Sequence, residues 1–61
     1  MLEQEIVRLK LIEYINEYDV KSKRFSKLCD VSEVTISLFI NGKRMLSQKN
    51  LHIIWNDINN N

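Results

Sequence analysis

The stretch VKSKRFSKLCDVSEVTISLFINGKR, residues 20–44, decides the fold that we expect for this chain of 61 residues. It contains two short helical patterns, which a break at 30–32 separates. The apolar positions of the first pattern are Phe25, Leu28 and Cys29. The apolar positions of the second pattern are Val34, Ile36, Phe39 and Ile40. The stretch therefore predicts two short helices in immediate succession, each with one apolar face.

Capping signals mark both ends of the second pattern. The Ser32 hydroxyl can accept from the free N–H groups that open a helix, and Thr35 can add to the same cap. Asn41 and Gly42 close the helix, because glycine reaches the left-handed conformation without a Cβ clash. Two helices of this length, joined by a turn of three or four residues, match the helix-turn-helix pattern. This pattern indicates DNA binding through the second helix.

The rest of the chain is typical of a small all-α protein. Because a chain this short buries little surface, we expect one domain, 1–61, built as a compact helical bundle with local contacts. The absence of proline and the single glycine disfavour a turn-rich β architecture. Periodicity and capping residues predict helices at about 2–18, 22–29, 32–41 and 48–58, with a frayed tail at 59–61.

Several functional classes have no signature in this sequence. It contains no nucleophile–base pair, no carboxylate dyad, no glycine-rich phosphate loop and no metal-ligand cluster around its lone His52. We therefore expect no enzyme activity, metal, cofactor or small-molecule substrate. The single Cys29 falls on an apolar face, as a buried structural thiol does. Without an apolar run of about 18 residues or a signal peptide, a soluble cytoplasmic protein is expected, with no membrane partner.

The net charge of +1 is unevenly distributed along the chain. Residues 1–20 carry −3, residues 21–49 carry +5 and residues 50–61 carry −1. The basic residues of the middle segment are Lys21, Lys23, Arg24, Lys27, Lys43, Arg44 and Lys49. This excess coincides with the helix-turn-helix pattern, as phosphate binding requires. The other interpretation is the solvated face of an ordinary helical domain.

Residues 32–44, S-E-V-T-I-S-L-F-I-N-G-K-R, resemble a known signature. It is V-S-x-x-T-I-S-x-x-E-x-G-K-R, the recognition-helix pattern of the Cro and phage-repressor (lambda repressor-like, XRE-type) helix-turn-helix domains. With Phe25 and Ser26 in place of a Leu-Ala pair, the resemblance extends back to Val20. It implies a four-helix lambda repressor-like bundle. It also implies a sequence-specific regulator of transcription that binds double-stranded DNA, encoded by a phage or mobile element.

The resemblance also implies which residues contact DNA. The third helix would enter the major groove, and the base-reading positions correspond to Glu33, Val34, Ser37 and Leu38. The phosphate contacts would come from Lys21, Ser22, Lys23, Asn41, Lys43, Arg44 and Lys49. The base-reading set contains no Arg, Gln or Asn, which make the strongest bidentate base contacts. This departure leaves open a protein-binding module on the same fold, such as an antirepressor or an inhibitor of another protein.

Three further departures give structural predictions. Lys21 stands at the family's cap position for the second helix, with Ser22 as the other candidate cap. Asp30 replaces the turn glycine, and Asp tolerates the left-handed conformation better than most residues. The positions where many family members place a buried Arg–Glu pair are Ile15 and Ile40 in this chain, so we expect these two side chains to touch.

The two outer helices carry the remaining apolar residues. In the first helix, one stripe faces the core and comprises Val7, Leu11, Tyr14, Ile15 and Tyr18. A second stripe, Leu2, Ile6 and Leu9, is explained either by an apolar monomer surface or by a partner, and a homodimer contact is our hypothesis. Such a dimer should bind a pseudo-palindrome with half-sites roughly 34 Å apart. Met45 and Leu46 are expected to anchor their loop to the core, and Leu51, Ile54, Trp55 and Ile58 to bury the last helix, with Ile53 outside.

Overall fold

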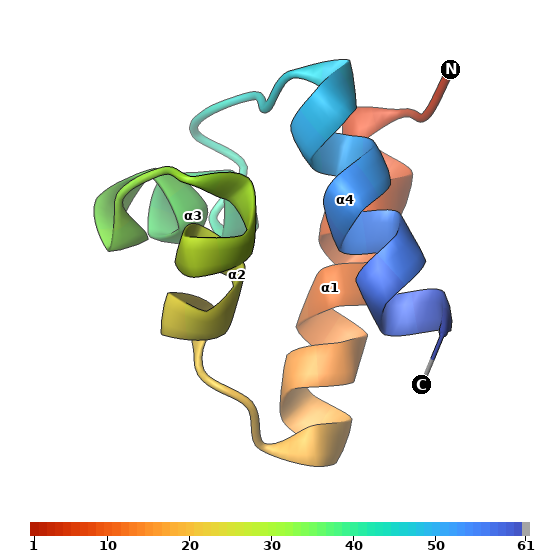
Figure 1. Ribbon diagram of the computed structural model, residues 1–61, viewed down its shortest axis with the longest axis vertical. Coiled ribbons are helices and arrows are strands. Elements are labelled where there is room, and N and C mark those ends of the chain that lie inside the picture. Colours follow the sequence, from red (N-terminus) through yellow and green to blue (C-terminus); the bar gives the residue numbers. More distant parts are fainter. Residues whose placement is uncertain (61) are drawn as a thin grey trace.

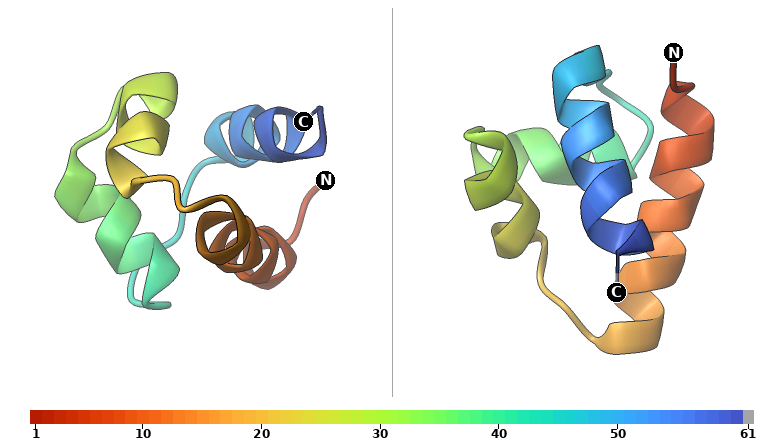
Figure 2. Two further views of the ribbon diagram at one scale, coloured as in Figure 1. Left: turned by 90° about the horizontal axis from the view of Figure 1, so that it is seen from below. Right: turned by 45° about the vertical axis from the view of Figure 1, so that its right-hand side comes forward.

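Two long helices form one side of the molecule in the computed structural model, which describes residues 1–60. These helices, α1 (Gln4–Tyr18) and α4 (Gln48–Asn59), lie side by side and run in the same direction (Figure 1). The shorter α2 (Ser22–Cys29) and α3 (Glu33–Ile40) lie together on the other side (Figure 2). Within residues 1–60 the secondary structure consists of these four helices, without a strand. The expected all-α class is therefore confirmed.

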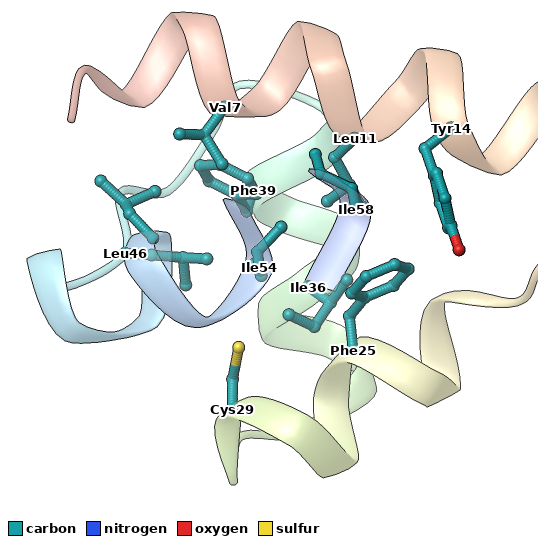
Figure 3. Packing of buried hydrophobic residues seen from close by; sticks show 11 residues of the cluster. Val7, Leu11, Tyr14, Phe25, Cys29, Ile36, Phe39, Leu46, Ile54 and Ile58 are labelled. Carbon is teal, nitrogen blue, oxygen red and sulfur yellow. The ribbon is translucent and has the colours of Figure 1, made fainter. Parts of the chain in front are cut away.

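The core lies where all four helices meet, and every helix contributes to it. Phe25 of α2 and Phe39 of α3 are the largest of its fully buried side chains. Figure 3 shows them packed with aliphatic side chains from α1 and α4. The full buried cluster is Val7, Leu11, Tyr14, Phe25, Cys29, Ile36, Phe39, Leu46, Leu51, Ile54 and Ile58. The 3.6-residue periodicity identified most of these positions in advance.

Four apolar residues lie elsewhere than the sequence indicated. Leu28 is 42% exposed, because Phe25 and Cys29 occupy the core side of the two-turn helix α2. Tyr18 is 55% exposed at the last turn of α1, where its ring contacts Tyr14 with centroids 4.8 Å apart. Met45 is exposed and only Leu46 anchors the loop, so this prediction was half wrong. Ile53 packs against the core instead of facing outward, because the buried side of α4 is wide.

The turn between α2 and α3 depends on a left-handed Asp30, with φ 56° and ψ 47°, as predicted. The Val31 amide donates to the Ser26 carbonyl at 3.0 Å, and the Asp30 amide points at the Lys27 carbonyl at 3.4 Å. These two bonds close α2 in the same way as the glycine-terminated Schellman motif does. Ser32 then caps α3, since its hydroxyl accepts from the Thr35 amide at 3.1 Å.

The last four carbonyl groups of α3 all have hydrogen-bond partners. The Ser37 carbonyl accepts from the Asn41 amide at 3.0 Å. The carbonyls of Leu38 and Phe39 accept from Lys43 and Gly42, which complete a second Schellman motif around Gly42 at φ +75°. The Ile40 carbonyl accepts at 3.1 Å from the guanidinium of Arg8, a residue of α1. A cation at this helix end also interacts favourably with the helix dipole.

The start of the chain is joined to the start of α4 by two carboxamide side chains. The Gln4 carboxamide donates to the Leu46 carbonyl at 2.7 Å and accepts from the Leu46 amide at 2.9 Å. The Gln48 carboxamide does the same with Leu2, accepting from its amide at 3.0 Å and donating to its carbonyl at 2.8 Å. These four bonds satisfy backbone groups that would otherwise need water.

Two polar contacts attach α2 to α4. Arg24 donates to the Asp57 carboxylate, with 3.0 Å between Nη2 and Oδ1. The Cys29 thiol points at the Asn50 carbonyl, with 3.8 Å between sulfur and oxygen. Cys29 is a free thiol in the core, and its burial raises the pKa of the thiol. The thiol therefore acts as a small apolar side chain in this core.

Candidate nucleic-acid interface

The outward side of α3 is a narrow surface that combines acidic, polar and apolar side chains. Glu33, Val34 and Ser37 are exposed on it, and Leu38 is half-buried at its edge. Val34 is 67% exposed, a large fraction for a β-branched apolar side chain. The inward side of the same helix is fixed by Ile36 and Phe39, which are buried. The four positions expected to read bases therefore share one face of one helix, with Leu38 less accessible than the other three.

The basic residues around α3 are exposed and come from three segments. Lys21 and Lys23 lie at the start of α2, Lys43 and Arg44 lie in the loop after α3, and Lys49 lies in the first turn of α4. In the view of Figure 1, α2 begins below α3 and α4 begins above it. Positive charge around a helix suits the phosphate backbones that border a DNA groove.

Two of the expected phosphate-contact residues, Ser22 and Asn41, are less available to a phosphate than the sequence indicated. Lys21 is the N-cap residue of α2 and makes no side-chain cap bond, while Ser22 is the first helical residue and is half-buried. Ser22 is therefore not a cap. Asn41 is exposed, and its side-chain amide donates to the Ser37 carbonyl at 2.9 Å. A phosphate contact through this amide would need to replace or share that bond.

Arg8 was not among the residues that the sequence indicated. Its Nε donates to Glu5 at 3.1 Å, and its Nη2 donates to the other carboxylate oxygen of Glu5. The same guanidinium lies beside Gly42, where an added Cβ would be 3.9 Å from Cζ and from Nε. The hydrogen bond to Arg8 lowers the pKa of Glu5, and Glu5 in turn raises the pKa of Arg8. No sequence signal paired Arg8 with residues 40–42, because the hydrogen bond joins residues 32 positions apart.

The apolar stripe proposed for a dimer divides into two parts. Leu2 is half-buried and packs against the core, with its backbone held by Gln48. Ile6 and Leu9 are 50% and 55% exposed, one turn apart on α1. The accessible part of the stripe is therefore small.

A shallow open recess of about 180 Å³ lies between α1 and α4, lined by Lys10, Glu13, Tyr14, Glu17, Tyr18, Ile58 and Asn59. Its walls come from helices other than α3, so it does not form part of the candidate interface. Within residues 1–60, no three His, Cys, Asp or Glu side chains gather as metal ligands do. No helix in the same range has the length and apolar content needed to cross a membrane.

Comparisons with protein families, with curated proteins and with solved structures found no match to this chain. We therefore infer the function of this chain from its residues and their arrangement.

Proposed function

We propose that this protein is a regulator of transcription of the Cro or repressor type, which binds double-stranded DNA. In this proposal α2 and α3 act as a helix-turn-helix within a lambda repressor-like bundle, and α3 enters the major groove. The observation that carries the proposal is the exposed face of α3, together with exposed lysine or arginine residues at the start of α2, in the loop after α3 and in the first turn of α4. The turn and cap geometry around Asp30 and Ser32 gives further support.

Base recognition would come from the exposed face of α3. The Glu33 carboxylate can accept from the amino group of cytosine, and the Ser37 hydroxyl can donate or accept. Val34 and Leu38 can cover thymine methyl groups. Each of these contacts discriminates weakly by itself, so we expect modest specificity from each half-site.

Affinity would come mainly from phosphate contacts. Lys43 and Arg44 follow the end of α3 in the chain, Lys21 and Lys23 lie at the start of α2, and Lys49 lies in the first turn of α4. Neutralising a phosphate releases condensed counterions, so the logarithm of the affinity should fall with log salt by roughly 0.9 for each contact. Four or five such contacts would give a slope of about −4.

The test is titration of random duplex DNA at several salt concentrations, with the protein's mass in solution recorded alongside. Arg44→Ala should weaken binding to all sequences and reduce the slope by about 1. Lys10→Ala is the matched control, because it removes one exposed positive charge from α1, a helix outside the interface. Ser37→Ala should change the preference among sequences more than the affinity for random DNA. Absence of binding at low salt would refute the proposal.

A protein-binding module is the second candidate function. The observation that favours it is Val34, which is 67% exposed beside the half-buried Leu38 on a face without Arg, Gln or Asn. Apolar side chains exposed on a helix are typical anchors for a protein groove. Under this alternative Val34→Asp would abolish partner binding, and the wild-type protein would show no salt-dependent affinity for DNA.

A further inference from the structure

The loop between α3 and α4 is attached to the start of α1 at both of its ends. At the first end, Arg8 donates to the Ile40 carbonyl at 3.1 Å and lies beside Gly42. At the second end, the Gln4 carboxamide binds both backbone groups of Leu46, at 2.7 and 2.9 Å. One turn of α1 separates Gln4 from Arg8, so a single rigid element spans the loop.

Lys43 and Arg44 lie between these two attachments, and both side chains are exposed. The Lys43 amide is itself held by the Leu38 carbonyl at 2.8 Å. From Ile40 to Leu46 the backbone therefore has fixed points at 40, 42, 43 and 46. A loop with this many fixed points presents its two basic side chains from a defined position.

We infer that Gln4 and Arg8 are positioning residues, which hold the Lys43–Arg44 segment in the arrangement that contacts phosphate. The inference depends on the proposed DNA-binding function. Its physical basis is conformational entropy: a loop that is ordered before binding does not need to be ordered by the DNA. Neither residue needs to touch the DNA for this effect.

Gln4 gives the sharper test, because its side chain carries no charge. Gln4→Met keeps a similar length and removes both bonds to Leu46. Any change in DNA affinity then cannot come from altered charge. Gln48→Met is the matched control, since it removes the equivalent two bonds to Leu2 and leaves those to Leu46 in place.

We expect Gln4→Met to weaken binding to random duplex DNA by roughly threefold to tenfold at fixed salt. The salt slope should stay at the wild-type value, because the phosphate contacts still form once the loop is ordered. Lys43→Ala should instead reduce the slope by about 1. Measurements well below the unfolding temperature, with folding checked by circular dichroism, exclude a loss that reflects stability alone.

Arg8→Lys is the second variant, which keeps the charge and loses the forked contact to Glu5 and Ile40. It should also weaken binding at an unchanged salt slope. In the DNA-free protein, Gln4→Met should speed hydrogen exchange at the Leu46 amide, which it releases from the Gln4 carboxamide.

If wild-type protein binds DNA and Gln4→Met binds as tightly as the wild type, the positioning inference is overturned. A loss in Gln48→Met as large as that in Gln4→Met would overturn it as well. If the wild type binds no DNA, the proposed function fails, and that result is distinct because it appears before any variant is compared.

Discussion

Arg24 and Asp57 form an ion pair that joins α2 to α4, with 3.0 Å between Nη2 and Oδ1 across 33 positions of the sequence. The guanidinium also lies 6.0 Å from the centre of the Phe25 ring. The hydrogen bond to Asp57 raises the pKa of Arg24, with the charge of Asp57 adding to the effect. The pair therefore adds a polar contact to the apolar core that joins the α2–α3 half to the α1–α4 half.

Removing this pair should lower stability slightly, because the Arg24 side chain is 41% exposed and water screens the attraction. A double-mutant cycle with Arg24→Met and Asp57→Asn, measured by urea unfolding, should give a favourable coupling energy. The coupling should shrink at about 1 M salt, where the screening length is about 3 Å. A coupling that is zero at low salt would contradict this assignment.

Removing one methyl group from the core should lower the free energy of unfolding more than removing one from the surface. Ile54 is fully buried, so Ile54→Val should lower the free energy of unfolding by about 1 kcal/mol. Ile6→Val makes the same chemical change at a half-exposed position of α1, and its effect should stay within about 0.5 kcal/mol. Chemical denaturation measures both. Equal losses in the two variants would contradict the burial assigned to Ile54.

The two Schellman turns should respond in opposite directions to substitution. Asp30 has φ 56°, a conformation in which glycine carries no Cβ penalty, so Asp30→Gly should raise the free energy of unfolding by roughly 0.5–1 kcal/mol. Gly42 has φ 75°, so Gly42→Ala should lower it by about 1 kcal/mol. Thermal unfolding of the two variants tests the signs, and a stabilising Gly42→Ala would contradict the left-handed turn.

The Cys29 thiol should be slow to react in the folded protein. Burial raises its pKa, so less thiolate is present at any given pH than in the unfolded chain. The sign follows from linkage: the contribution to stability is intact below the ordinary thiol pKa and is lost as pH rises through the raised value. A thiol reagent should label native protein much more slowly than denatured protein. Cys29→Ala should reduce the loss of stability at alkaline pH.

The Glu5 carboxyl group should titrate below its ordinary range. The hydrogen bond from Arg8 lowers its pKa, so its contribution to stability is present above the ordinary value and is lost as pH falls through the lowered value. The contribution is small because the side chain is exposed. Carbon-detected NMR titration should show the Glu5 midpoint rising toward the ordinary value in Arg8→Met. An unchanged midpoint would contradict the pairing.

The sequence predicted the elements well because its signals are local. The cap at Ser32, the left-handed Asp30 and the glycine after α3 all depend on residues within one or two turns. The predicted start of α1 was wrong by two residues, because Leu2 bonds to Gln48 instead of continuing the helix. That bond joins distant segments, and no local pattern indicates it.

The sequence predicted which residues make up the candidate interface. It did not predict which residues of α1 hold the loop after α3 in place. The basic positions could be counted from the sequence, and the face of α3 follows from helical periodicity. The roles of Gln4 and Arg8 could not be predicted, since a glutamine or arginine on a helix surface is compatible with many environments. The contact expected between Ile15 and Ile40 stays a prediction. Both residues pack against the core, and it is Arg8 that reaches the Ile40 backbone.

The bonds between the start of the chain and the start of α4 have a consequence for folding during translation. Gln4 is paired with a residue 42 positions later, and Leu2 with one 46 positions later. During translation the first helix therefore has no partner for these groups until residues 46–48 have been made. Closing so long a loop before any contact forms is entropically costly. The four-helix unit is thus expected to fold in a single step, without a stable intermediate that contains α1 alone.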